Sequence, residues 1–124
     1  MFVPGLPVRG LYAPHLHAIC IRSGQTRSMR RSILAEELAH HELAHRPTPD
    51  RGEVARMEVR AQRRAARQLI SLEDLAAALT AASWEEAAEQ LEVDVALLHT
   101  RTACLTVTEV GELRRMVGHR ELGL

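Results

Sequence analysis

The segment AEELAHHELAH, at residues 35–45, contains the pattern HExxH between His41 and His45. Two histidines four residues apart lie on one face of a helix, where their ring nitrogens can hold one zinc ion. The glutamate after the first histidine, here Glu42, is placed to act as a general base toward water. The pattern predicts a metal site for hydrolysis, but a helix surface with several solvated His and Glu side chains fits it equally well.

A second pattern of the same shape begins five residues earlier. It reads EExxH, so that Glu36 takes the place of the first histidine, with Glu37 as the base and His40 as the second ligand. A carboxylate can bind zinc as a histidine does. With about 100° of rotation per residue, these three residues share the polar side of the predicted helix. His41 lies at the edge of that side and is an alternative ligand or a residue at the rim of the site.

The helical wheel separates the two patterns. Glu42 and His45 of the HExxH pattern fall among Leu34 and Leu38, on the side that we expect to form the apolar stripe of the helix. A base that must contact water should not lie on a buried stripe. The wheel therefore favours the EExxH pattern, and Glu42 and His45 remain the alternative base and ligand of the literal pattern.

A third ligand is expected from the next helix. Glu58 shares one face of that helix with Ala61 and Ala65, whose small side chains allow another helix to approach closely. Glu58 is thus predicted to point inward as a ligand, although a Glu paired with a buried Arg or His has the same pattern. Glu53 is a weaker competitor. The opposite face gathers arginines that we expect in solvent, namely Arg56, Arg60, Arg63 and Arg67.

The rest of the chain predicts a mostly helical fold with a small β-element. Residues 1–15 are rich in Pro and Gly and are predicted to be loop, apart from a strand that begins at 10–12 and pairs with the run HAICIR at 17–22. Thr48 is the expected cap of the second helix, with Pro49 at its first position. Caps and prolines delimit six helices, at residues 27–45, 49–70, 72–81, 84–91, 95–103 and 106–118.

Length and composition are ordinary for a globular chain. The 124 residues predict one domain, 1–124, with a metal-site core at 10–70 and a helical tail at 71–124. Sixteen basic and sixteen acidic residues balance, so net charge gives no reason to expect a nucleic acid or a membrane as partner. No signal peptide and no apolar stretch of membrane-spanning length is visible, so the cytoplasm is the expected location.

The segment 84–105 has helix-turn-helix spacing, with Glu92 at the turn where a Gly is usual. A DNA-binding helix of this type carries basic or polar side chains into the major groove. The second helix here offers mainly His99 and Arg101, which is little positive charge for gripping phosphates. A packed helical pair is therefore the favoured interpretation, and DNA is a weakly supported partner.

Two segments together resemble a known family. RRSILAEELAHHELAH, residues 30–45, is similar to the core of the ImmA/IrrE-type metallo-endopeptidases, whose usual motif is LAHELGH. Residues 58–70 look like the second motif of that family, E-x-x-A-x-x-x-A-A-x-x-L. The resemblance runs from about residue 10 to about residue 105. It implies a predominantly helical α+β fold, in which a small β-element packs on a zincin-like pair of helices and a helical tail follows.

The resemblance also implies roles for individual residues. Glu37 takes the base position, His40 that of the second zinc ligand and Glu58 that of the third. Glu36 stands where the family usually has a histidine, so the site would be harder and could prefer another divalent metal. The family fold has a helix ahead of the β-element, whereas this sequence begins almost at the β-element.

The function that the resemblance implies is metal-dependent cleavage of a regulatory protein, such as a transcriptional repressor of a phage or mobile element. The departure at Glu36 leaves a second possibility open. A catalytically weak or inactive member of the family could act as a protein-interaction module or as a helix-turn-helix regulator that binds DNA.

Overall fold

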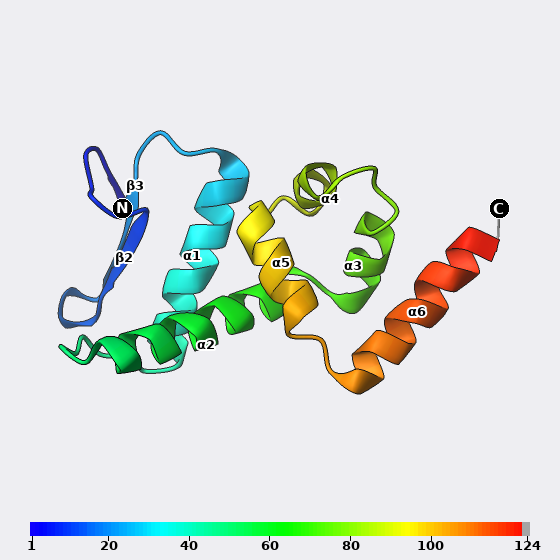
Figure 1. The fold of residues 1–124 in the computed structure, drawn as a ribbon. Helices are drawn as coiled ribbons and strands as arrows, with labels where there is room; N and C mark the ends of the chain where they lie inside the picture. The colour runs from blue at the N-terminus through cyan, green and yellow to red at the C-terminus, as the bar shows by residue number, and fades with distance from the viewer. Residues whose placement is uncertain (123–124) are drawn as a thin grey trace.

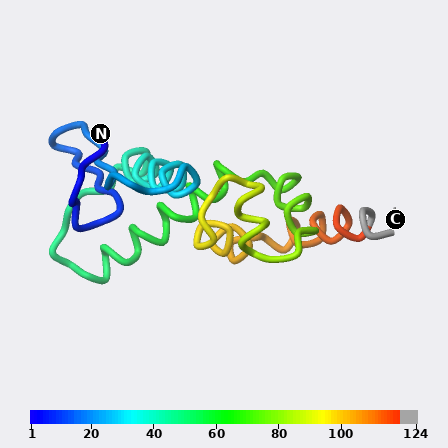
Figure 2. Tube along the Cα trace, turned by 90° about the horizontal axis from the view of Figure 1, so that it is seen from above, coloured from blue at the N-terminus to red at the C-terminus, as the bar shows by residue number. Residues whose placement is uncertain are grey.

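The computed structural model describes residues 1–122, which form three strands and six α-helices (Figure 1). This is a predominantly helical α+β fold with a small N-terminal sheet, as the sequence predicts. Figure 2 shows an elongated molecule, with the sheet at one end and the last helix at the other. Within residues 1–122, no helix is long and apolar enough to cross a membrane.

The sheet has the order β1-β3-β2. The expected hairpin is confirmed: β2 (Gly10–Ala13) pairs antiparallel with β3 (Ala18–Arg22). A 3₁₀ turn at Pro14–Leu16 joins them, and His17 adopts a left-handed conformation, so β3 begins one residue later than predicted. Strand β1 (Phe2–Val3) lies in a region predicted to be loop. It pairs parallel to β3 over only two residues, too few to leave an alternating pattern.

Helix α1 (Arg27–Glu42) begins at the predicted cap, where the Thr26 hydroxyl accepts a hydrogen bond from the Met29 backbone. It ends three residues earlier than predicted. Ala44 adopts a left-handed conformation with φ of 56°, and the His45 N–H returns to the His40 carbonyl oxygen at 2.9 Å. This is a Schellman turn, a common helix ending, here formed with an alanine where glycine is usual.

Helix α2 (Arg51–Leu69) also begins later than predicted. Asp50, and not Thr48, caps it by accepting hydrogen bonds from the Gly52 and Glu53 backbones. The Thr48 hydroxyl accepts from the Asp50 N–H instead, so it orders the turn that leads into the cap. Four shorter segments follow: α3 (Leu72–Ala78), α4 (Trp84–Leu91), α5 (Val95–Ala103) and α6 (Val107–Leu122). Helix α3 stops before residue 81 and α6 continues past 118.

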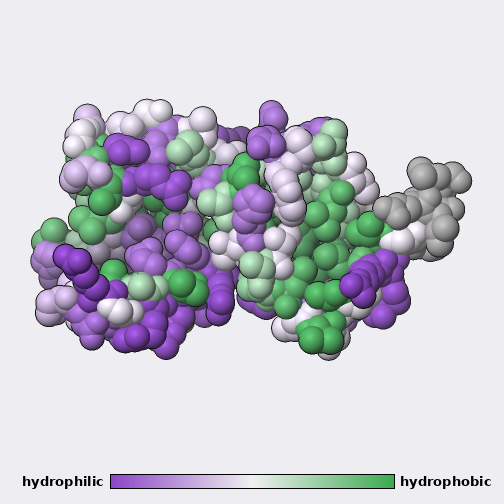
Figure 3. Space-filling model, in the orientation of Figure 1, coloured by the Kyte–Doolittle hydropathy of each residue, from purple (hydrophilic) through white to green (hydrophobic). Residues whose placement is uncertain are grey.

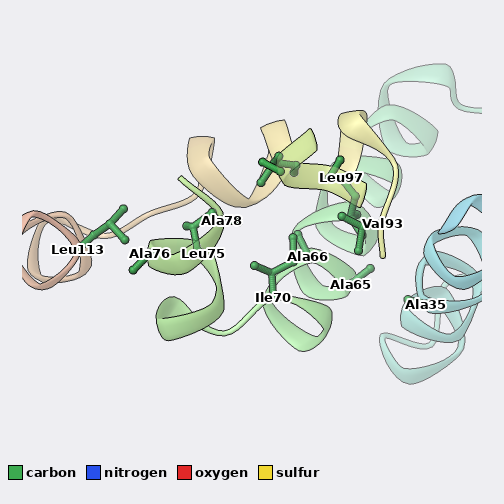
Figure 4. Packing of buried hydrophobic residues seen from close by; sticks show 13 residues of the cluster. Ala35, Ala65, Ala66, Ile70, Leu75, Ala76, Ala78, Val93, Leu97 and Leu113 are labelled. Atoms are coloured by element: carbon green, nitrogen blue, oxygen red, sulfur yellow. The ribbon is translucent and has the colours of Figure 1, made fainter. Parts of the chain in front are cut away.

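One hydrophobic cluster joins α1 and α2 to the C-terminal helices (Figure 4). Ala35 of α1 and Ala65 and Ala66 of α2 belong to the same cluster as Ile70 and Leu75, and all of these except Ala35 are fully buried. The cluster also takes in Val93, Leu97, Leu98 and Leu113. Helices α3 to α6 therefore pack on the same core as the helices that carry the predicted site.

The turn between α4 and α5 docks on the first half of α1. The Asp94 N–H donates a hydrogen bond to the buried Ser32 hydroxyl at 3.0 Å, and the Arg31 guanidinium donates to the carbonyl oxygens of Leu91 and Glu92. Glu92 has φ of 56°, the left-handed conformation for which a helix-turn-helix motif usually employs glycine. This turn is thus an anchoring point within the protein.

Helix α5 carries few basic side chains that could enter the groove of DNA. Arg101 is only 3% exposed and points inward, where it donates hydrogen bonds to the Ile70 carbonyl oxygen and to Glu109. His99 is exposed but lies against the Trp84 ring at a centroid distance of 4.7 Å. Arg101 and His99, the two basic side chains that could have contacted DNA bases, therefore contact other residues of the protein. This supports a packed helical pair over a DNA-binding motif.

Gly10 is where β2 crosses α1, and we expect Gly10→Ala to destabilise the protein by about 1–3 kcal/mol, the usual range for overpacking. A Cβ atom at this position would lie 2.3 Å from Ile33 Cγ2 and 3.4 Å from Glu37 Cγ, so the strand or the helix must shift. Urea denaturation measures the change. Gly118→Ala in α6 is the matched control, because a Cβ there meets no atom within 4 Å. Wild-type stability for Gly10→Ala would contradict the close approach.

Candidate metal centre

The predicted site lies on the face of α1 that turns toward α2 and β2. His40 is 8% exposed on this face, together with the buried Ile33. The expected apolar stripe is wrong in part, because Leu34 and Leu38 are 42% and 40% exposed. The reason is that α1 packs through its alanines and its polar residues onto α2 and the sheet, while these two leucines lie outside that contact.

His40 and Glu58 meet across the two helices. The His40 Nε2 atom donates to Glu58 Oε1 at 3.1 Å, and the His40 side chain is 11% exposed while that of Glu58 is 51% exposed. The hydrogen bond from His40 lowers the pKa of Glu58, and the hydrogen bond to Glu58 raises the pKa of His40. Glu58 thus faces α1 with its side chain half exposed, and the contact matches the alternative that this glutamate pairs with a buried histidine.

Two more carboxylates lie half-buried beside this pair. Burial raises the pKa of Glu36 to about 7, against the opposing charge of Arg9. Burial likewise raises the pKa of Glu37, which His40 and a hydrogen bond from the Tyr12 backbone partly offset. The negative charges of Glu37 and Glu58 add to the rise at Glu36. The site therefore concentrates carboxylates that a bound cation would stabilise in their ionised form.

Two hollows open beside these side chains. Glu37, His40 and Glu58 line the larger one, which lies between β2 and the beginning of α2. Glu37 and Glu58 also line the second hollow, where Glu36 lies near Arg9. The structure thus places Glu37 and Glu58 at the boundary of the two hollows, with His40 on one side and Glu36 on the other.

The residues of the literal HExxH pattern are separated by the end of α1. Glu42 turns to the other side of α2, where it accepts hydrogen bonds from Arg64 at 3.0 and 2.5 Å and from Gln68 at 3.2 Å. His45 lies beyond the helix, and its ring Nδ1 is 2.8 Å from Nδ1 of His40. The two residues therefore do not share one helical face, because the Schellman turn redirects the chain between them.

The remaining candidates have other partners. His41 is exposed, and its Nδ1 atom lies 2.9 Å from the hydroxyl of Tyr12, a residue that lines the larger hollow. Glu53, the weaker competitor for the third ligand, pairs with Arg56 three residues later at 2.9 Å. Tyr12 is a residue of the site that the sequence alone did not single out. Its only sequence signal is its place on the first strand of the hairpin that is predicted ahead of the metal helix.

The donor set fits a divalent cation in part. Two ligands of one tetrahedral zinc ion, each bound at 2.0–2.1 Å, lie about 3.3 Å apart, close to the 3.1 Å between His40 Nε2 and Glu58 Oε1. The nitrogen and oxygen donors are also of the right type. Within the described residues, however, no group of three or more His, Cys, Asp or Glu side chains converges on one point, so Glu36 does not complete the set in this conformation.

The fold and the site define a helical pair that carries a His–Glu cluster beside the edge of a small sheet. A family model described as the IrrE N-terminal-like domain, a peptidase family, matches residues 7–102. The chain therefore belongs to this family, and the resemblance to ImmA/IrrE-type proteins is confirmed. The match ends within α5 and does not include α6. Searches of curated proteins and of solved structures found no match.

We expect Glu36→Gln to stabilise the metal-free protein at pH 8 by about 1–2 kcal/mol, less than the full pKa shift would give because solvent screens part of it. The folded-state pKa of about 7 lies above the ordinary 4.5, so the Glu36 carboxylate opposes folding increasingly as pH rises from 4.5 through 7. The difference should vanish at pH 4. Urea denaturation with a chelator present measures it, and a Gln variant less stable than wild type at pH 8 would contradict the burial.

Proposed function

We propose that this protein is a metal-dependent endopeptidase with its site between α1 and α2. The observation that supports the proposal most strongly is the contact of His40 with Glu58 at 3.1 Å, directly beside the half-buried carboxylate of Glu37. These three residues occupy the positions that the family resemblance assigns to two ligands and a base. They line one hollow together, as groups that act on one substrate must.

In this proposal His40 and Glu58 hold Zn²⁺ or another divalent cation, and Glu36 is the third ligand. A bound divalent cation supplies Lewis-acid polarisation of the scissile carbonyl group. Two carboxylates and one imidazole form a harder donor set than two imidazoles and one carboxylate, which favours cations that prefer oxygen. The raised pKa of Glu36 supports its role, because burial disfavours the ionised form in the metal-free protein and a bound cation would stabilise that form.

Glu37 acts as the general base in this proposal. Its carboxylate takes a proton from the attacking water and delivers that proton to the nitrogen of the leaving amine. Burial raises its pKa above the ordinary value, which makes the carboxylate a stronger base than an exposed one. The hydrogen bond from the Tyr12 backbone holds the carboxylate in place while it accepts and releases the proton.

The substrate would be an extended peptide beside β2. This strand is at the edge of the sheet, so one side of it has no neighbouring strand and can take an extended chain, although the Tyr12 backbone there also binds Glu37. The hollow that His40 lines also has apolar walls, to which the partly exposed Val8, Leu11 and Val54 contribute. We infer a preference for peptides with apolar side chains near the scissile bond. The family resemblance supports a cytoplasmic regulatory substrate such as a phage or mobile-element repressor.

A non-catalytic protein-interaction role is the second candidate. It is favoured by one observation, that Glu36 and His40 line different hollows and the described residues converge on no complete metal-binding group. A DNA-binding role has less support, since Arg101 is buried and paired. Metal binding separates the catalytic from the non-catalytic proposal, because only the first requires it.

We expect the purified protein to bind about one zinc ion per chain, and His40→Ala and Glu58→Ala to lose it, because each removes a ligand. Equilibrium dialysis with elemental analysis measures the content. His99→Ala is the matched control, since His99 lies against Trp84 on α5. Glu36→His, which restores the residue usual in the family, should bind zinc at least as tightly as wild type. Zinc retained in both alanine variants would refute this ligand assignment.

We expect Glu37→Gln to lower peptide hydrolysis by about 10²–10⁴-fold, the usual contribution of a general base, while zinc remains bound. The assay uses a fluorogenic peptide library with apolar flanking residues. Glu42→Gln is the matched control, because Glu42 is the base of the literal HExxH pattern and pairs with Arg64 outside the hollow. Loss of activity in Glu42→Gln with Glu37→Gln active would reverse the choice between the two patterns.

A further inference from the structure

Both ring nitrogens of His40 have a partner in the structure. Nε2 faces Glu58 Oε1 at 3.1 Å, and Nδ1 faces Nδ1 of His45 at 2.8 Å. The second contact is shorter and brings two rings together at a centroid distance of 5.0 Å and an interplanar angle of 61°. His45 is also tied to the same residue through its backbone, whose N–H donates to the His40 carbonyl oxygen.

We propose that His45 is a positioning residue, which fixes the ring orientation and the tautomer of His40 for metal binding. The inference rests on the proposed function and deepens it. It gives His45 a role that neither sequence pattern assigns, because the literal HExxH pattern would make this residue a ligand itself.

The direction of the hydrogen bond follows from the chemistry of imidazole. A neutral ring carries one proton, and a ring that binds a metal through Nε2 must carry it on Nδ1. In the ion pair with Glu58, a protonated His40 donates from both nitrogens. In the metal-bound ring and in the doubly protonated ring, Nδ1 of His40 donates and Nδ1 of His45 accepts. In a neutral metal-free ring that donates from Nε2 to Glu58, the direction reverses and His45 donates. The same partner thus serves the ring with and without metal.

The chain forms this contact through the end of α1. Ala44 adopts the left-handed conformation, which reverses the direction of the backbone. His45 therefore lies back over the last turn of the helix. A non-glycine residue in this conformation is disfavoured, so the surrounding contacts must stabilise the turn. The 2.8 Å between the two Nδ1 atoms is a hydrogen-bond distance and is shorter than the about 3.3 Å that separates two ligands of one zinc ion.

The test compares two substitutions of His45 that differ in one property. His45→Phe keeps an aromatic ring but removes the acceptor, whereas His45→Gln keeps a side-chain oxygen that can accept from His40. Zinc affinity is measured by competition with a chromogenic chelator, and urea denaturation checks that each variant is folded. We expect His45→Phe to bind zinc about 10–100-fold more weakly, the usual effect of losing such a partner, and His45→Gln to bind nearly as tightly as wild type.

A spectroscopic readout separates positioning from a general effect on folding. In zinc-loaded wild type, NMR should show a proton on Nδ1 of His40 that exchanges slowly with water, and His45→Phe should lose that protection. Ala44→Gly should retain it, because glycine adopts the left-handed conformation readily.

Three results would overturn the inference. Wild-type zinc affinity in His45→Phe would show that the contact has no role, and complete loss of zinc in both His45 variants would make this residue a ligand. A His40 ring protonated on Nε2 in the zinc-loaded protein would reverse the hydrogen bond. If wild type itself binds no zinc, the proposed function fails first, and this inference fails with it.

Discussion

The close packing of α1 on α2 determines the rest of the site. Ala39 of α1 and Ala61 and Ala65 of α2 are fully buried, and such small side chains let two helix backbones approach closely. Only at this short separation can a glutamate of one helix reach a histidine of the other, as Glu58 reaches His40. Each alanine buries little area, so the stability of the interface depends on the close packing of the two helices. A larger residue at these positions would move the helices apart and separate Glu58 from His40.

Local signals in the sequence predicted the parts of the fold that depend on local chemistry. Helices α4 and α5 have the predicted bounds, because Ser83 and Asp94 cap them with their own side chains. The predicted end of α1 at residue 45 is wrong, because the sequence gives no sign that Ala44 adopts a conformation that glycine usually occupies. Strand β1 was missed because two paired residues form no periodic pattern.

The helical wheel of α1 favours the EExxH pattern because it predicts a buried stripe of leucines on the other side, and that prediction is only partly correct. It assigned Leu34 and Leu38 to the core, yet the polar side with His40 is the one that faces α2 and the sheet. Hydrophobic periodicity cannot anticipate a helix that buries polar side chains, because the contacts around them come from residues distant in sequence. The second motif at Glu58 identified the inward face where the wheel did not.

The arginines of α2 also have a more ordinary role than their number indicates. Arg56 pairs with Glu53, Arg64 with Glu42 and Arg67 with Glu109. Figure 3 shows hydrophilic residues over the half of the molecule that holds α2, while hydrophobic residues gather toward the C-terminal helices. Three of the arginines on this helix are thus paired with acidic residues, one on α2 itself and two on other helices, which offsets part of the positive charge of this helix.

The docking of the α4–α5 turn on α1 has a consequence for how the protein can be divided. Asp94 and Ser32 join the tail to the helix one turn before Glu36, and Arg9 contacts Asp94 at 3.2 Å from the loop that leads into β2. A fragment that ended at Ile70 would lose this support and would expose the fully buried Ala65, Ala66 and Ile70 to water. The helical tail is thus part of the scaffold of the site, and a shorter chain would lack the structure that holds its helices in register.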